Sequence, residues 1–140
     1  MTFNKLTPNF EVQNIKKTVD FYVNVLGFSL VMIVPETQDG IEQTIADGKE
    51  YVFAMVVKDK VELMFQESES FKQDLKFAKG LSIAASISFY MEVNEVDKLY
   101  NDLKNKVSEI SELKTAWHGM REFYIKDING YMLGFAEKVQ

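Results

Sequence analysis

Carboxylates within strand-like segments are the side chains of this sequence best suited to chemistry. Glu11, Glu62 and Glu92 each lie in a stretch where polar and apolar residues alternate. Carboxylates can bind divalent metal ions or act as general acids and bases. Glu11 and Glu62 could form such a pair, although the sequence does not fix their separation. A metal site made of Glu11, Glu62 and Glu92 is one hypothesis, and three solvated residues at strand ends are the other.

Other reactive side chains are few. The chain has one histidine, His118, and no cysteine, which excludes disulfides, thiolate metal sites and a cysteine nucleophile. Ser86 and Ser88 lie in a strand-like segment, but a serine nucleophile needs a base within hydrogen-bonding distance and no histidine is close in sequence. The 7 glycines are dispersed and form no phosphate-binding loop. We predict no catalytic residue and no cofactor.

Gly134 interrupts the apolar segment YMLGFAE at 131–137. Glycine adds no packing to a strand and weakens it, so its presence needs a reason. One interpretation is a bulge or a close approach of another backbone segment. The other is a position emptied for a ligand or for a neighbouring aromatic ring, and the two are compatible.

The elements that position these residues occur in one order twice. In the first half, alternation predicts a strand over 7–12, followed by a helix with Asn14 as its N-cap and Gly27 at its end. The apolar positions of this helix recur at three- and four-residue spacing and are Ile15, Val19, Tyr22 and Leu26. Three strands follow, at 28–34, 50–57 and 61–67.

The second half repeats this order. Alternation predicts a strand over 86–93, and Asn94 with Asp97 should open a helix. A short strand over 107–113 and a strand over 120–126 follow. The strand at 131–137 should be joined to its predecessor by a two-residue Asn129-Gly130 hairpin turn.

The two halves also resemble each other in sequence. FEVQNIKK at 10–17 aligns with MEVNEVDK at 91–98, and VELMFQE at 61–67 resembles YMLGFAE at 131–137. We therefore predict an α+β fold of two βαβββ modules, whose curved mixed sheet surrounds a concave cavity with helices on the outer face. The whole chain, 1–140, should form a single domain. Module one covers about 1–67, a linker with a short helix covers 68–80, and module two covers about 81–140.

Strand parity predicts which side chains face each way. Those that should pack on the helices are Phe10, Val12, Leu63, Phe65, Ile87, Phe89, Leu133 and Phe135. Those that should line the concave side are Thr7, Asn9, Glu11, Glu62, Met64, Ser88, Tyr90, Glu92, Met132 and Gly134. A shift of one residue in register would invert the assignment.

Composition narrows the range of partners. The formal net charge is −5 and the basic residues are scattered, so nucleic acid is an unsuitable partner. No apolar run approaches the length of a membrane span, and the N-terminus lacks the apolar core of a signal peptide. We expect a soluble cytoplasmic protein.

The segments VDFYVNVLGF in the first half and WHGMREFYIKDINGYMLGFAE at the end together resemble the vicinal oxygen chelate superfamily. That superfamily contains glyoxalase I, extradiol dioxygenases, metal-dependent fosfomycin resistance enzymes and metal-free bleomycin resistance proteins. The resemblance implies four metal-ligand positions in its metal-dependent members, and here these hold Thr7, Glu62, Ser88 and Gly134. Only Glu62 could bind a metal ion, so the resemblance implies a metal-free member.

The pattern W...REF.I.D..G at 117–130 is similar to that of bleomycin resistance proteins, although the turn lacks their common proline. The resemblance implies a homodimer that sequesters an amphipathic or cationic small molecule. Aromatic and methionine side chains on the concave side, with a few carboxylates, suit such a ligand. The predicted ligand-binding residues are Trp117, Tyr124, Tyr90, Glu62, Met64, Glu11, Gly134, Asn9 and Ser88, and neighbouring candidates are Met132 and Phe53. One alternative is a lyase, isomerase or dioxygenase relative that uses Glu62 with an atypical metal site or without a metal ion. Another alternative is a structural or regulatory dimer that binds no ligand.

Overall fold

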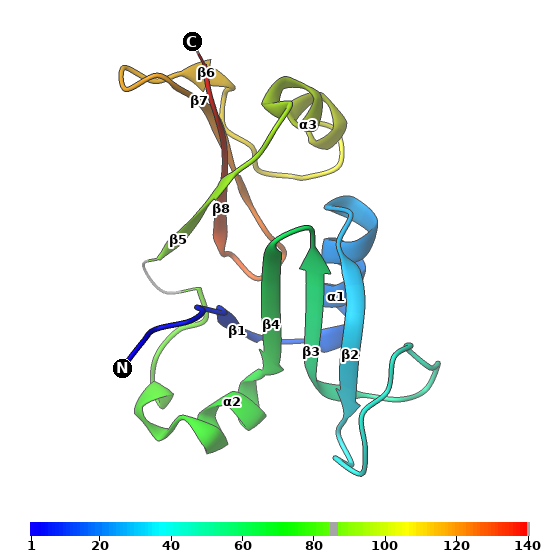
Figure 1. The fold of residues 1–140 in the computed structure, drawn as a ribbon. Coiled ribbons are helices and arrows are strands. Elements are labelled where there is room, and N and C mark those ends of the chain that lie inside the picture. The colour runs from blue at the N-terminus through cyan, green and yellow to red at the C-terminus, as the bar shows by residue number, and fades with distance from the viewer. Residues whose placement is uncertain (85–86, 140) are drawn as a thin grey trace. The chain divides into compact units, whose positions relative to one another are not determined.

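The fold is described from a computed structural model that covers residues 1–140, of which 1–84 and 87–139 are described in detail (Figure 1). The chain divides into two compact units, Met1–Leu81 and Ser82–Gln140. We call them unit 1 and unit 2, and each is described by itself. In the described part of the chain, no helix has the length and apolar character needed to cross a membrane.

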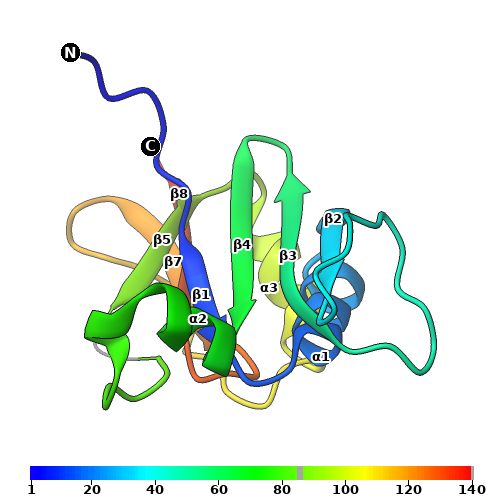
Figure 2. The same ribbon diagram turned by 90° about the horizontal axis from the view of Figure 1, so that it is seen from below.

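Unit 1 contains one four-stranded sheet and its helices. The strands are β1 (Asn9–Val12), β2 (Ser29–Pro35), β3 (Tyr51–Lys58) and β4 (Val61–Glu67). They lie in the order β1-β4-β3-β2, with β1 parallel to β4 and the other pairs antiparallel. The helices are α1 (Ile15–Asp20), continued by the π-helix η1 (Phe21–Val25), then α2 (Ser68–Asp74) and the 3₁₀-helix η2 (Lys76–Ala78). Figure 2 shows α2 beside β1 and β4.

Unit 2 repeats this plan. Its strands are β5 (Ser88–Glu92), β6 (Lys114–Thr115), β7 (Met120–Lys126) and β8 (Met132–Lys138), and its helix is α3 (Val96–Leu103). The order β5-β8-β7-β6, with β5 parallel to β8, matches β1-β4-β3-β2 strand for strand. The predicted α+β class and the two modules of one topology are therefore confirmed. The predicted cavity common to both modules stays a prediction.

The helix of unit 1 forms as its sequence predicts. The Asn14 side chain accepts a hydrogen bond from the Lys17 backbone N–H at 2.9 Å, which caps the first turn. At the other end Gly27 adopts a φ of +82°, the left-handed conformation that ends many helices. The four predicted apolar positions of this helix are all buried, as are Phe10, Val12, Leu63 and Phe65 of the sheet. The Tyr22 ring contacts the rings of Phe10 and Phe65.

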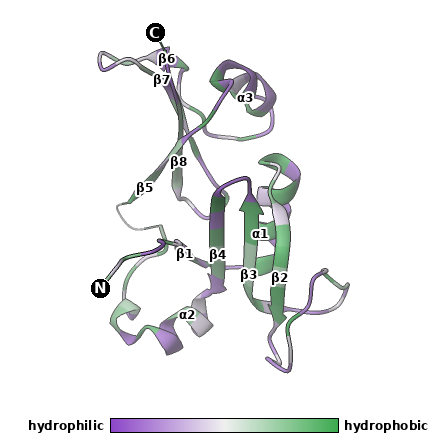
Figure 3. Ribbon diagram, viewed as in Figure 1, coloured by the Kyte–Doolittle hydropathy of each residue, from purple (hydrophilic) through white to green (hydrophobic). Residues whose placement is uncertain are grey.

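The core of unit 2 lies between its sheet and α3. Val96 and Leu103 of the helix are buried, as are Phe123, Leu133 and Phe135 of the strands. One prediction was wrong here, because Ile87 lies before β5 and is 54% exposed. Ser86, which was expected to start this strand, lies outside the described residues. Figure 3 shows the apolar residues along the strands of both sheets.

Asn94 was predicted to open α3, but a residue far away in the sequence holds the first turn of this helix instead. Glu95 precedes the helix in the left-handed conformation with a φ of +60° and makes no side-chain cap. Instead the Glu137 carboxylate of β8 accepts hydrogen bonds from the backbone N–H groups of Glu95 at 3.0 Å and Val96 at 3.1 Å. The prediction failed because the capping group is 41 residues further along the chain from Val96.

The predicted strand over 107–113 is replaced by an irregular segment. Ile110 pairs with Ile125 through an isolated bridge, and the regular strand β6 begins only at Lys114. Beside this bridge the Ser111 hydroxyl accepts the Tyr124 backbone N–H at 2.8 Å. Because a side chain takes the place of a backbone carbonyl there, a regular ladder does not form.

The β7–β8 turn also differs from its prediction. Gly130 has a φ of +90°, but Asn129 is not among the residues with positive φ, so the two-residue turn that requires both is excluded. The Asp127 carbonyl accepts the Gly130 N–H, and the Asp127 N–H donates to the Tyr131 carbonyl. The buried Asp127 carboxylate accepts the N–H groups of Asn129 and Tyr131, which stabilises this three-residue loop.

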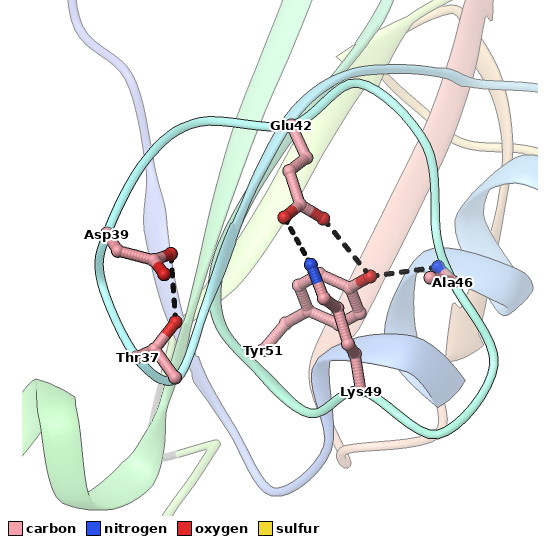
Figure 4. Close-up of polar contacts among 6 residues, drawn as sticks. All are labelled: Thr37, Asp39, Glu42, Ala46, Lys49 and Tyr51. Carbon is pink, nitrogen blue, oxygen red and sulfur yellow. Dashed lines mark hydrogen bonds and ion pairs between the residues drawn. The ribbon is translucent and has the colours of Figure 1, made fainter.

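The long loop between β2 and β3 is closed by a polar cluster (Figure 4). The Glu42 carboxylate contacts Lys49 Nζ at 2.6 Å and accepts a hydrogen bond from the Tyr51 hydroxyl at 3.5 Å. The same hydroxyl accepts the Ala46 N–H at 2.8 Å. The hydrogen bond to the Glu42 carboxylate raises the pKa of Lys49. These contacts fix the loop against β2, where Glu42 also pairs with Ile33.

Candidate functional site

Three predicted ligand-binding residues come together on the face of the unit 2 sheet that is opposite α3. We call the face of each sheet without its long helix the outward face. Gly134 of β8 is paired with Tyr90 of β5 on one side and with Tyr124 of β7 on the other. Directly paired residues lie on the same face of a sheet. Tyr90, Gly134 and Tyr124 therefore form one row across three strands.

Gly134 is explained by the ring of Tyr124. A Cβ atom at position 134 would lie 2.6 Å from Tyr124 Cε1 and 3.0 Å from Cδ1. The pairing of β8 with both neighbours continues through Gly134 without a register shift, so there is no bulge. The interpretation that the position is emptied for a neighbouring aromatic ring is confirmed.

A carboxylate connects the two tyrosines. The Tyr90 hydroxyl donates a hydrogen bond to Glu122 Oε1 at 2.8 Å, and the two rings lie 6.4 Å apart, centroid to centroid. Partial burial and the nearby Glu122 carboxylate raise the pKa of Tyr90 to about 12, and the same causes raise the pKa of Tyr124. His118 Nε2 lies 3.7 Å from the same Glu122 oxygen. We call Tyr90, Glu122, Tyr124 and His118, with Gly134 beneath, the tyrosine cluster.

Three more predicted residues lie near the tyrosine cluster. Trp117 is 96% exposed, and its ring contacts that of His118 at a centroid separation of 5.4 Å. Met132 is 43% exposed, and it is paired with Ser88 two residues before the Tyr90–Gly134 pair. These side chains extend the face on which the tyrosine cluster lies.

Glu122 was missed by the sequence analysis, although a signal for it was present. It precedes Tyr124 by two residues in the same alternating strand, so both side chains must lie on one face. Glu122 is the residue through which Tyr90 and His118 are connected.

The predicted residues of unit 1 form a second outward face. Asn9 of β1 is paired with Met64 of β4, and Phe53 of β3 is paired with Gln66. Asn9 Nδ2 donates to Gln66 Oε1 at 3.0 Å, and Gln66 Nε2 in turn donates to Ser70 and Asp74. This network attaches α2 to the β1–β4 edge of the sheet.

The two carboxylates of the unit 1 face are already engaged. Glu62 contacts Lys5 Nζ at 2.6 Å. Glu11 is 5% exposed, accepts the Ser68 hydroxyl at 2.6 Å and lies 3.6 Å from Lys72 Nζ. Neighbouring cations therefore balance both negative charges.

The donor set does not fit a catalytic metal ion. Such sites usually hold three or more protein ligands, whereas Thr7, Glu62, Ser88 and Gly134 include one carboxylate, and that carboxylate pairs with Lys5. Space beside Gly134 is filled by Tyr124. In residues 1–84 and 87–139, no three histidine or carboxylate side chains gather closely enough to hold a metal ion. Glu11 and Glu62 belong to unit 1 and Glu92 belongs to unit 2, so a metal site made of all three stays a prediction.

Comparison with known proteins gives a consistent family match. The family model described as the Glyoxalase/Bleomycin resistance protein/Dioxygenase superfamily matches residues 8–135. Bleomycin resistance proteins from Geobacillus stearothermophilus and Staphylococcus aureus are each 26% identical over 142 residues, which covers 95% of this chain and 96% of the relative.

Solved structures share the fold at low sequence identity. A bleomycin-binding protein from Streptomyces verticillus, complexed with copper(II)-bleomycin, has a TM-score of 0.63 and 20% identity, with 99% of each chain covered. An antibiotic-binding protein from Streptomyces sp. CB03234 has a TM-score of 0.69 and 16% identity, again with 99% of each chain covered. A protein of unknown function from Agrobacterium tumefaciens has a TM-score of 0.71 and 18% identity, with 99% of this chain and 97% of that chain covered.

Proposed function

Because the chain belongs to the Glyoxalase/Bleomycin resistance protein/Dioxygenase superfamily, we propose that it binds and sequesters a small amphipathic molecule that carries a cationic group. The tyrosine cluster is the observation that supports this proposal. It places two aromatic rings and one carboxylate on the same outward face of a sheet. The protein holds its ligand and makes or breaks no bond in it.

The chemistry of the tyrosine cluster favours a cation. The faces of aromatic rings attract a positive charge within about 6 Å of the ring centre. Glu122 adds a carboxylate whose side chain is 16% exposed, so its charge is only partly screened by water. The chain carries a formal net charge of −5, which favours the approach of a cation over a wider range.

Sequestration fits the residues better than catalysis does. The positions that hold metal ligands in the metal-dependent relatives lack the donors for a metal site, as described above. A role for Glu62 as a catalytic base is less supported, because Lys5 lies 2.6 Å from its carboxylate. Relatives at 26% identity are named bleomycin resistance proteins. We propose that the protein is a metal-free binder and, like the family members it resembles, a homodimer.

The experiment is a calorimetric titration of chelator-treated protein with metal-free bleomycin. We expect saturable binding with a Kd of about 1 μM or tighter, which corresponds to about −8 kcal/mol. Absence of heat from bleomycin and from a panel of amphipathic amines would contradict the proposal. Tight, stoichiometric binding of zinc, nickel, manganese or iron would contradict its metal-free part.

Matched variants test whether the ligand binds at the tyrosine cluster. Tyr90→Leu removes a ring and should weaken binding about tenfold, which is about 1.4 kcal/mol. Tyr90→Phe keeps the ring and should weaken binding less. Tyr51→Phe is the control, because Tyr51 is 3% exposed and lies in the polar cluster of the β2–β3 loop in unit 1.

A further inference from the structure

The outward face of the unit 1 sheet carries three methionines in one row. Met32 of β2 is paired with Met55 of β3, and Met55 is paired with Met64 of β4. All three are half-buried, while their chain neighbours Ile33, Ala54 and Leu63 are buried on the opposite side of the sheet. We call Met32, Met55 and Met64 the methionine row.

A polar atom without a partner lies at the end of this row. Asn9 is paired with Met64 and so follows it across the sheet. Its Oδ1 atom is buried and has no hydrogen-bond partner within residues 1–84 and 87–139, whereas its Nδ2 atom donates to Gln66. A buried acceptor without a donor is unfavourable, and it gains when a bound molecule supplies an N–H or O–H group.

We propose that the methionine row is the surface on which the ligand places a flat, uncharged aromatic ring that bears one N–H or O–H group. This inference rests on the proposed function and adds the chemistry of a second contact surface. Thioether sulfurs are polarizable and make favourable contacts with aromatic rings, and unbranched methionine side chains adapt to the shape of a bound group. Because Asn9 Oδ1 is buried, its contact with the ligand requires that the side chains covering it move aside as the ring binds.

The charges around the row explain why the ring is uncharged. Glu62 is balanced by Lys5, and Glu11 is balanced by Lys72 with a further bond from Ser68. A cationic ring would meet these ammonium groups and find no uncompensated carboxylate beside the row. The tyrosine cluster differs, because Glu122 is held by the neutral Tyr90 hydroxyl and by His118.

The first test uses indole, a flat neutral molecule with one N–H group, and protein labelled with ¹³C in its methionine methyl groups. Of the 7 methionines, the signals of Met32, Met55 and Met64 should shift on titration. Met91 of unit 2, which is paired with Phe135 and lies on the face opposite the tyrosine cluster, is the internal control, and its signal should not move. Shifts confined to unit 2 signals, or no shifts up to the solubility limit of indole, would overturn the inference.

The second test compares indole with 1-methylindole, which has a similar shape but no N–H group. Wild-type protein should bind indole about fivefold more tightly, the ratio expected of one hydrogen bond. In Asn9→Ala this preference should disappear. Equal affinities for the two molecules in the wild-type protein would overturn the role of Asn9 without requiring any variant to fold.

The sulfur atoms are tested by Met55→Leu, which keeps the apolar volume. Indole should bind this variant about threefold more weakly, and it should bind Met91→Leu in unit 2 as it binds the wild type. An unchanged affinity in Met55→Leu would overturn the role of the row.

The bleomycin titration separates this inference from the proposed function. If bleomycin binds but no methionine of the row responds to it or to indole, the inference fails and the function stands. If indole shifts the row and neither bleomycin nor the amine panel binds, the proposed function fails and the apolar ring site alone remains.

Discussion

At the scale of single residues, Gly134 and Tyr124 act as a pair. The missing side chain of Gly134 leaves the space that the Tyr124 ring fills, since a Cβ atom there would lie 2.6 Å from Cε1. The ring in turn lies 6.4 Å from Tyr90 and beside the carboxylate that Tyr90 contacts. The glycine therefore determines the position of an aromatic ring in the proposed site.

Gly134→Ala should lower the free energy of unfolding by about 1–3 kcal/mol, because the new methyl group displaces the Tyr124 ring. The same substitution in a Tyr124→Ala background should cost less, which urea denaturation of the four proteins can measure. Gly40→Ala is the control, because no heavy atom lies within 4 Å of a Cβ atom built there. Equal costs in both backgrounds would show that the ring is not the cause.

The Tyr90 phenol should titrate at a pKa of about 12, above the ordinary tyrosine value of 10.0, because partial burial and Glu122 both favour its neutral form. The pKa of Tyr90 is higher in the folded protein than in the unfolded chain, so the neutral phenol stabilises the folded state. This stabilisation is complete below pH 10 and is lost as the pH rises towards 12. Absorbance titration of wild type against Tyr90→Phe measures it. Glu122→Gln should lower this pKa, and an unchanged value would contradict the role of the carboxylate.

At the scale of elements, α3 depends on contacts from the sheet for its first turn. Glu137 of β8 accepts the N–H groups of Glu95 and Val96. Glu137→Ala should therefore lower the free energy of unfolding by about 1 kcal/mol and speed hydrogen exchange at these two amides. Glu92→Ala removes an exposed carboxylate of the same sheet and should change neither quantity.

Arg121 of β7 binds the same turn of α3 through Asp97, whose Oδ1 and Oδ2 lie 3.0 and 3.2 Å from Nε. This contact lowers the pKa of Asp97. A lowered folded-state pKa gives a stability contribution that is present above the ordinary value and is lost as the pH falls through the folded one. Arg121→Gln should return the Asp97 pKa to about 3.9, observable by NMR of its carboxyl carbon. A pKa that stays low in this variant would show that another group holds it.

At the scale of the whole molecule, large apolar side chains on unit 1 are left exposed. Phe77 is 100% exposed, and Phe3 and Leu6 are each 90% exposed. Exposed large apolar side chains are candidates for an interface with another protein chain. The proposed homodimer predicts a mass twice the 16.1 kDa of the chain in sedimentation equilibrium. Phe77→Ser should weaken the dimer if this side chain contributes, and a monomer at about 100 μM wild-type protein would contradict the proposed dimer.

Much of the fold could be predicted because it depends on local patterns. The observed β4, Val61–Glu67, has the predicted bounds, and the residues expected to face α1 are buried. Predictions failed where a distant or unusual partner replaced a local one. Examples are the Glu137 cap of α3, the Ser111 hydroxyl beside β7 and the Asp127 carboxylate in the β7–β8 turn.

The sequence by itself determined the α+β class and the repeated module and, with the exception of Ile87, the side of the strands on which the predicted core residues lie, because alternation and helical spacing act between near neighbours. Only the tertiary structure decided which side chains meet. Tyr90 contacts Glu122 across 32 residues of sequence, and Lys5 contacts Glu62 across 57. Such contacts depend on strand register, and a shift of one residue would turn every side chain of a strand to its other face.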